Sequence, residues 1–434
     1  MNIHLKNIFN VRHSVKHNKF LWMLFVFAII SIRTYKRFLL PEIWAEDGAV
    51  FLQDAYNMSP VKSLFGVYAG YVHMIPRLFS YFLVLLPVSI IPYVLFLFCF
   101  VITGLTLSYF LREEFSYLAP SVPLRGLLCA LLAFSLPFNE VFGNICNLQW
   151  FLNIFLVFFA LSDVKYKHKK WQIAVYALSI FSSGFFPVIF FLIVFKFAFL
   201  TIVKGDKTYL KENIVLAIVT LFCLILFCVN IIKYGGGRMA DVNAIFSIKY
   251  LIAGIWYYVY SIICFPLKGL PEYGFSISEQ VYEMIIPLSC FAICCYKLIK
   301  ERKIKFAVAS LVLGAVFYMG LILFGAIEAI GKNKGLLLSR YYIFLIFTGI
   351  FLWVYLFAQI PVVKYTKIVL FLGIVSIASS SFGENRFFIE PYGYDNLWKK
   401  NQAKLSYHIK NRSDKQTRRM ESAGGGGVFH AHIS

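Results

Sequence analysis

Long apolar blocks alternate with short basic segments along most of this chain. A soluble domain could not bury so many of them, and it would expose apolar patches far larger than monomers tolerate. Most blocks are long enough to cross or nearly cross a bilayer. We therefore expect an all-α, polytopic transmembrane domain over residues 1–382, with about eleven spans. They lie at roughly 20–39, 91–111, 125–138, 149–162, 171–185, 187–203, 213–232, 281–298, 306–327, 341–359 and 367–381.

Two further apolar segments do not fit this count as crossings. Prolines bracket segment 74–88, and proline is best placed where helices start or break. Counting 247–267 as a span would move the basic cluster at 297–305 to the wrong side of the membrane. We expect both segments to lie at the interface or to re-enter.

The charge pattern orients the chain. Its 42 Lys and Arg against 21 Asp and Glu give a net charge of +21. The cations gather near the N-terminus and at 165–170, 204–211 and 297–305, between apolar blocks, which places these segments in the cytoplasm. This distribution, without a base-reading motif, argues against nucleic acid as a partner. Eleven spans put the basic tail, 383–434, in the periplasm, although its charge alone favours the cytoplasm.

Metal binding is not predicted. The nine Cys lie mostly inside apolar blocks, without the spacing of zinc ligands and without clustered His nearby. We interpret them as small core residues.

The loop after the first span has a different chemistry. Glu42, Glu46, Asp47 and Asp54 fall within thirteen residues, and 41–54 contains no Lys or Arg. If this stretch is helical, Asp47 and Asp54 share a face with two aromatic residues. Carboxylates close to a membrane are costly unless they are paired or functional. The alternative is an ordinary acidic loop beside an aromatic belt.

Residues 44–54 followed by 68–77 resemble the first extracytoplasmic loop of bacterial GT-C-type glycosyltransferases. The closest likeness is to the serotype-converting glucosyltransferases that modify O-antigen in enterobacteria and their phages. Residues 139–144 with 147–150 are similar to that group's second outer loop, and 183–187 and 339–342 fit it too. The resemblance implies a multi-pass protein of the bacterial inner membrane with its active site in outer loops 41–77 and beyond, on the periplasmic face.

The resemblance also implies a reaction. A sugar, with glucose expected, moves from a polyprenyl-phosphate donor to the O-antigen repeat of lipopolysaccharide, and an acidic residue of the first outer loop is the general base. No cofactor is implied, since the donor is already activated. The partners would be the lipid-linked donor, the O-antigen acceptor, membrane lipids, and a donor synthase and donor-sugar flippase of the same pathway.

The chemistry needs a carboxylate at the acceptor hydroxyl and cations at the departing phosphate. We expect Asp47 and Glu46 as catalytic residues, with Asp54 and Glu140 supporting them at sugar hydroxyls. Phosphate and other substrate contacts are expected from a set near the outer boundary: His73, Arg77, Arg238, Arg340 and Tyr341. Each cation has an alternative role as an interfacial anchor.

Two other functions fit a protein of this kind. O-antigen polymerases are also large aromatic-rich membrane enzymes, but they carry a long, Arg-containing outer loop late in the chain, whereas the acidic segment here comes early. Lipid-linked oligosaccharide flippases and other transporters tend to show internal repeats and charges in mid-bilayer. The sequence has no convincing repeat.

Overall fold

The computed structural model describes residues 15–234, 306–332 and 339–359. Short gaps fall at 69, 139–140, 164–167, 204 and 206–207, and isolated positions are described between 255 and 296. The regular elements within these ranges are helices, joined by one isolated bridge between Tyr68 and Tyr71. The expected all-α class is therefore confirmed for this part of the chain.

The apolar blocks correspond closely to helices. The long elements are α2 (Val15–Leu39), α6 (Ile91–Ser108), α7 (Val122–Ser135), α8 (Gln149–Leu161), α9 (Lys170–Phe181), α10 (Phe186–Ala198), α11 (Thr208–Tyr234), α16 (Phe306–Lys332) and α17 (Ile343–Gln359). Segments 247–267 and 281–298, apart from isolated positions, and 367–434 lie outside the described residues.

Among the side chains that the structure describes, the apolar stretches of these helices fall into two groups by length. Asn18–Leu39 and Ile91–Leu111 are long and apolar enough to cross a membrane. Other apolar stretches are shorter: Gln149–Leu161, for example, has 13 residues and spans roughly 20 Å, less than the hydrocarbon core. Two such segments give limited support for membrane association, and they leave open how many times the chain crosses.

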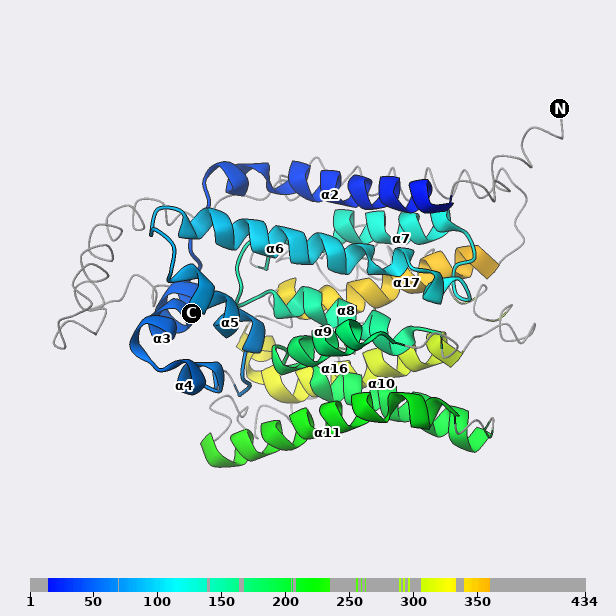
Figure 1. Ribbon diagram of the computed structural model, residues 1–434. Helices are drawn as coiled ribbons and strands as arrows, with labels where there is room; N and C mark the ends of the chain where they lie inside the picture. The colour runs from blue at the N-terminus through cyan, green and yellow to red at the C-terminus, as the bar shows by residue number, and fades with distance from the viewer. Residues whose placement is uncertain are drawn as a thin grey trace.

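The helices form a bundle around α8 (Figure 1). Helix α2 lies along one side and packs on α6 and α7, while α10 contacts α11 and α16 towards the opposite side. Helix α8 packs against α6, α9, α10 and α17. Every residue of α8 from Phe151 to Leu161 is buried. A helix that is apolar all round belongs in the middle of a bundle, which is where α8 lies.

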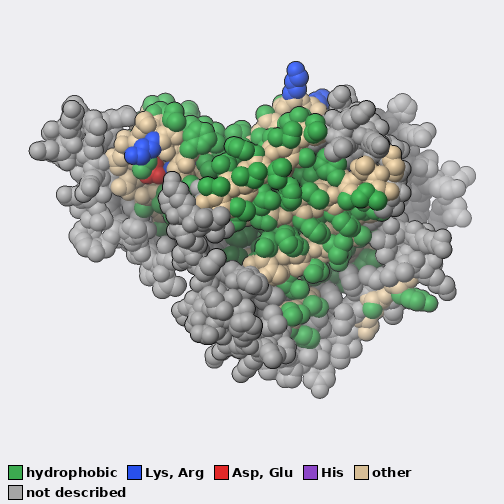
Figure 2. All heavy atoms as spheres, turned by 90° about the horizontal axis from the view of Figure 1, so that it is seen from below, with side chains coloured by type: hydrophobic (Ala, Val, Ile, Leu, Met, Phe, Trp, Pro, Cys, Tyr) green, Lys and Arg blue, Asp and Glu red, His purple; other side chains and the backbone are tan. Residues whose placement is uncertain are grey.

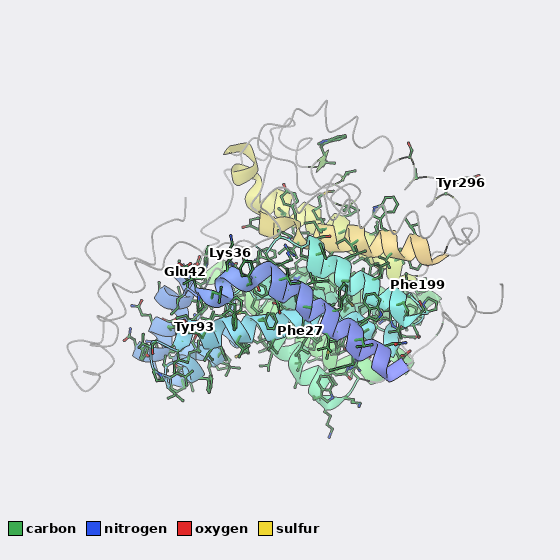
Figure 3. All side chains as sticks on the ribbon, turned by 90° about the horizontal axis from the view of Figure 1, so that it is seen from above. Phe27, Lys36, Glu42, Tyr93, Phe199 and Tyr296 are labelled. Carbon is green, nitrogen blue, oxygen red and sulfur yellow. The ribbon has the colours of Figure 1, made fainter. Side chains whose placement is uncertain are left out.

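Short helices gather at one end of the bundle (Figure 1). These are α3 (Gln53–Asn57), α4 (Pro60–Leu64) and α5 (Met74–Leu83). Figure 3 shows Lys36 near the end of α2, Glu42 and Tyr93 at this same end, and Phe199 at the other. Helix α5 has ten residues and, as expected for segment 74–88, is too short to cross a bilayer. The loop that carries the acidic residues therefore covers one end of the bundle.

Two glycines let α2 approach its neighbours closely. A Cβ at Gly104 of α6 would come within 2.4 Å of the Phe27 ring, and a Cβ at Gly126 of α7 would come within 2.1 Å of the Trp22 ring. Both rings belong to α2, and Phe27 lies midway along it (Figure 3). Aromatic side chains of α2 thus fill space that only glycine leaves free.

We expect Gly126→Ala to destabilise the protein, because the new methyl group overlaps the root of the Trp22 ring. Overpacking of this kind costs about 1–3 kcal/mol, measurable as a lower unfolding temperature in detergent. Gly320→Ala is the matched control, since a Cβ there meets nothing within 4 Å. Combining Gly126→Ala with Trp22→Leu should restore part of the loss. Equal effects of the two single glycine changes would contradict this packing account.

Candidate functional site

The acidic loop folds as a short irregular helix. A π-helical turn, η1 (Asp47–Leu52), runs directly into α3. The sequence raises a helix here only as a condition, and it does not indicate the π-helical turn. The buried Phe51 packs edge-to-face on Tyr68, with ring centroids 6.1 Å apart, and lies 5.2 Å from the His73 ring. The loop is thus folded onto the segment 68–73 that follows it.

Asp47 joins the loop that follows α2 to the loop between α7 and α8. Its Oδ2 accepts the backbone N–H of Ile145 and its Oδ1 accepts that of Cys146, both at 2.9 Å. The residue is completely buried, and burial raises the pKa of its carboxyl group to about 8, although the two N–H groups act in the opposite direction. With both oxygens occupied by backbone donors, this carboxylate fastens the two loops together.

Helix α2 supports the loop between α7 and α8 from another side. The Arg33 guanidinium donates to the carbonyl oxygens of Ala133 and Leu136, and Arg37 donates to that of Phe142 at 2.6 Å. Both arginines are buried. They satisfy carbonyl groups at the C-terminal end of α7 and just beyond it, groups that a helix cannot satisfy internally. The loop leading into α8 is therefore held on two sides, by α2 and by Asp47.

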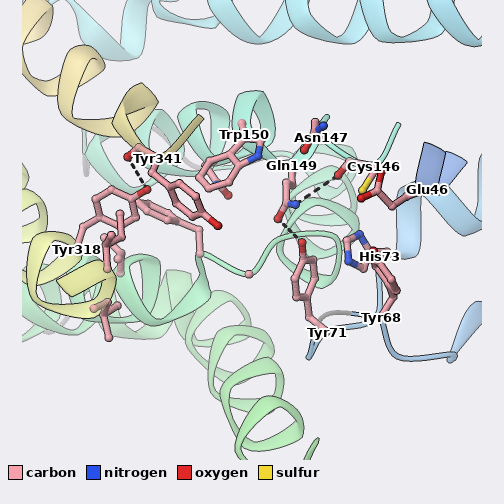
Figure 4. Close-up of a pocket in the computed structure, with 16 residues that line it drawn as sticks. Glu46, Tyr68, Tyr71, His73, Cys146, Asn147, Gln149, Trp150, Tyr318 and Tyr341 are labelled. Atoms are coloured by element: carbon pink, nitrogen blue, oxygen red, sulfur yellow. Dashed lines mark hydrogen bonds between the residues drawn. The ribbon is translucent and has the colours of Figure 1, made fainter. Parts of the chain in front are cut away.

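A cavity of about 280 Å³ lies between the outer loops and the helices beneath them (Figure 4). Figure 4 shows Glu46, His73, Tyr68 and Cys146 grouped on one side, and Trp150, Tyr318 and Tyr341 on the other. The complete lining is Glu46, Tyr68, Tyr71, His73, Cys146, Asn147, Gln149, Trp150, Asn153, Gly184, Phe185, Val188, Tyr318, Leu321, Ile322 and Tyr341.

Glu46 carries the formal negative charge of this lining, and it is left unsatisfied. Its Oε2 atom is buried and has no hydrogen-bond partner in the structure. Trp150 lines the same cavity, and its indole Nε1–H is likewise buried without a partner. Both ring nitrogens of His73, another lining residue, are also buried without a partner. Buried polar atoms in proteins are nearly always hydrogen-bonded, so these three side chains in one cavity indicate that a polar ligand completes it.

His73 is held as a neutral side chain. It stacks on Tyr71 with ring centroids 3.9 Å apart, and its backbone is left-handed with φ of 56°. Burial, and then the charge of Arg77, lower the pKa of the imidazole to about 3. A neutral ring can exchange hydrogen bonds with a ligand, but it offers no positive charge to a phosphate at physiological pH. This differs from the cationic role that we expected.

Asp54 and Arg77 form an internal ion pair. Arg77 Nη1 lies 2.7 Å from Asp54 Oδ2, and Arg77 Nε donates to the Val72 carbonyl at 3.0 Å. Arg77 is 1% exposed, and neither residue lines the cavity. Both residues were expected to contact substrate, but in the structure they are paired with each other. This ion pair stabilises the segment that follows α2, in which both residues lie.

The other expected site residues divide into two groups. Tyr341 lines the cavity, at the turn η5 (Ser339–Tyr342). The side chain of Arg340 in this turn, and Glu140 and Arg238, lie outside the described residues. No group of His, Cys, Asp or Glu in the described ranges is arranged to hold a metal ion.

Sequence reasoning missed several lining residues. The motif at 147–150 already drew attention to Gln149, whose Oε1 accepts the Tyr71 hydroxyl. Asn153 and Tyr318 were not predicted as site residues, because they lie inside otherwise apolar blocks. A lone Asn in a buried helix was the one available hint, since a buried amide needs partners.

We expect Asp47→Asn to destabilise the protein, because an amide can accept only one of the two backbone N–H groups and turns its NH₂ towards the other. An unsatisfied buried donor costs about 1–3 kcal/mol, to be measured by thermal unfolding. Glu46→Gln is the adjacent control and should leave the unfolding temperature nearly unchanged, since Glu46 Oε2 has no partner to lose. The reverse order of effects would refute the assigned contacts.

The lowered pKa of His73 predicts a pH dependence of stability. In the unfolded chain the His73 imidazole is protonated below its ordinary pKa of 6.5. In the folded protein it stays neutral until the pH falls to about 3. Stability should therefore fall as pH drops through this window, by up to about 1.4 kcal/mol per pH unit from this residue. In the variant His73→Asn, asparagine can adopt the left-handed backbone, and the titrating imidazole is removed. Unfolding temperatures between pH 4 and 7 should depend less on pH in the variant; parallel curves would contradict the assignment.

Comparison with known proteins yields no match: neither a family model, nor a curated protein, nor a solved structure is similar to this chain. The chemistry of the cavity therefore has to carry the functional argument.

Proposed function

We propose that this protein is a GT-C-type glycosyltransferase that uses a polyprenyl-phosphate sugar at the periplasmic face of a bacterial inner membrane. One observation carries the proposal. A carboxylate with an unpaired oxygen, Glu46, lies in a cavity whose lining includes several aromatic rings and three side-chain amides beside apolar residues. Aromatic faces and amides suit the apolar faces and hydroxyl groups of a sugar.

Glu46 takes the role of general base. It removes the proton of the acceptor hydroxyl as that oxygen attacks C1 of the donor sugar. The bond from C1 to the phosphate oxygen breaks, and the polyprenyl phosphate leaves with the electron pair. A carboxylate that is not already hydrogen-bonded can receive this proton, as Glu46 can.

Asp47 was the first candidate for the base, and the structure favours its neighbour. Both oxygens of Asp47 accept backbone N–H groups, and the residue does not line the cavity. We therefore assign Asp47 a positioning role, in which it holds the loop that bears Gln149 and Trp150 against the cavity. Adjacent residues of a helix project in different directions, so Glu46 can line the cavity while Asp47 does not.

The donor phosphate needs cations that the described lining does not contain. No Lys or Arg is among the lining residues that the structure describes. We keep Arg340 and Arg238 as the phosphate partners, with Arg340 preferred because it directly precedes the lining residue Tyr341. The phosphate would then lie at the cavity margin, with the sugar inside.

The outward helix faces support a bilayer environment. On α11, a stripe of exposed apolar residues repeats at helical spacing: Ile214, Val215, Ile218, Leu221, Phe222, Ile225 and Val229. Figure 2 shows hydrophobic side chains over the middle of the face seen from below, with Lys and Arg at its margins. Exposed apolar surface of this extent suits lipid rather than water. We accordingly retain the polytopic arrangement of about eleven spans.

The position of the cavity bears on the alternative functions. A transporter needs a route between both faces, but α8 continues beneath the cavity as a helix buried on all sides. This favours the transferase over a flippase or other transporter. An O-antigen polymerase acts on the same class of substrate and stays the second candidate.

We expect Glu46→Gln to lower sugar transfer by about 10²–10⁴-fold, the usual contribution of a positioned general base. Transfer is measured in membranes from cells that make the polyprenyl-phosphate donor, by mass analysis of the surface polysaccharide with and without the protein. Glu46→Asp should retain part of the activity, since the carboxylate is kept but shortened.

Two outcomes would overturn this proposal. Near-normal transfer by a stably inserted Glu46→Gln protein would exclude the base. A topology reporter fused after Asp54 that reads cytoplasm would place the cavity on the wrong face. Reporters after Lys170 and Lys211 provide the internal control, because the basic clusters place both in the cytoplasm.

A further inference from the structure

One part of the cavity presents hydrogen-bond donors without matching acceptors. Trp150 and Asn153 both line it, and they stand three residues apart on α8. Residues at this spacing share one face of a helix. The two side chains therefore serve the same part of the cavity wall.

A neighbouring serine fixes the orientation of the Asn153 amide. The backbone N–H of Phe185 donates to Ser183 Oγ at 2.9 Å, and the Ser183 hydroxyl donates to Asn153 Oδ1. Asn153 is 5% exposed, and Ser183 is fully buried. With its oxygen engaged by Ser183, Asn153 has its NH₂ group left for a ligand.

Trp150 contributes a second donor. Its Nε1–H is buried and without a partner, and an indole nitrogen can donate but not accept. The ring is packed edge-to-face against Tyr341, with centroids 5.5 Å apart, so its position is defined. The Tyr318 hydroxyl, which lines the same cavity, donates to the Tyr341 carbonyl at 3.0 Å.

A ligand group that fits two donors is one that only accepts. Hydroxyl groups both donate and accept, so they match this pair less well than a carbonyl oxygen does. A carboxylate or phosphate also accepts, but the described lining holds Glu46 and no Lys or Arg to offset a second negative charge. The remaining match is a neutral carbonyl oxygen.

We propose that Trp150 and Asn153 form a subsite for the acyl carbonyl of an acetamido sugar, with Ser183 as its positioning residue. The inference rests on the proposed function and refines it: the sugar in the cavity is an N-acetylhexosamine rather than glucose, the sugar expected from the resemblance. Ser183 acts through Asn153 and does not itself line the cavity.

The test compares two neutral ligands on the full-length protein in lipid nanodiscs. Methyl glycosides of N-acetylglucosamine and of glucose are titrated by saturation-transfer NMR, with methyl glucuronide as an anionic third arm. We expect the acetamido sugar to bind about tenfold better than the glucoside. Trp150→Phe keeps a ring but removes the donor, and should cut that preference about five- to tenfold, as expected for one hydrogen bond.

Ser183→Ala is the second variant, because it frees the Asn153 amide to turn without altering the cavity lining. It should reduce the same preference while leaving glucoside binding unchanged, which a merely structural defect would not do. Trp171→Phe is the matched control, since Trp171 is 53% exposed on α9 and does not line the cavity.

Three results would overturn the subsite. These are equal binding of the two neutral sugars, a preference that survives both Trp150→Phe and Ser183→Ala, and tighter binding of the glucuronide. In each of them the cavity still binds a sugar, so the glycosyltransferase proposal stands. If none of the three glycosides binds, the proposed function loses its support, and the subsite falls with it.

Discussion

The cavity depends on one contact between segments that are about a hundred residues apart. Asp47 accepts the N–H groups of Ile145 and Cys146, and so it fixes where the chain enters α8. Gln149 and Trp150 follow directly, at the start of that helix. If the two loops separated, the wall bearing these side chains would part from the wall bearing Glu46. The geometry of the site is therefore set by a carboxylate outside the cavity.

Asp47 is hydrogen-bonded through both oxygens, whereas its neighbour Glu46 has an oxygen without a partner. In apolar surroundings this difference is informative. Removing charge from water is expensive, so buried ionic groups are normally paired. Arg33, Arg37 and Arg77 all follow that rule, through carbonyl oxygens or through Asp54. Glu46 differs from these three residues, because its Oε2 is buried without a hydrogen-bond partner and the residue lines the cavity. A polar ligand in the cavity would complete the hydrogen bonds of this oxygen.

The helices could be predicted from sequence because a buried or lipid-facing helix needs a long apolar block, and α6 and α16 each begin at the expected residue. The acidic loop was also recognisable. What could not be predicted was which of two adjacent carboxylates faces the cavity, since its walls come from segments far apart in the sequence. The pairing of Arg77 with Asp54 depends on how the chain folds back between them, which charge counting does not reveal. Asn153 and Tyr318 could not be predicted as lining residues because each lies inside an otherwise apolar stretch of sequence.

The short length of α8 is the feature that ties fold to chemistry. Its 13 residues leave the outer part of the bundle to irregular chain, and that chain is buried: Phe142, Ile145 and Leu148 are each at most 1% exposed. Irregular backbone at this depth is tolerated when protein covers it or when it lines a cavity. Both conditions hold here, because Arg37 and Asp47 satisfy its polar groups and Cys146 and Asn147 line the cavity. A full-length α8 would fill this space with helix. The short central helix thus leaves room for a polar cavity at this end of the bundle.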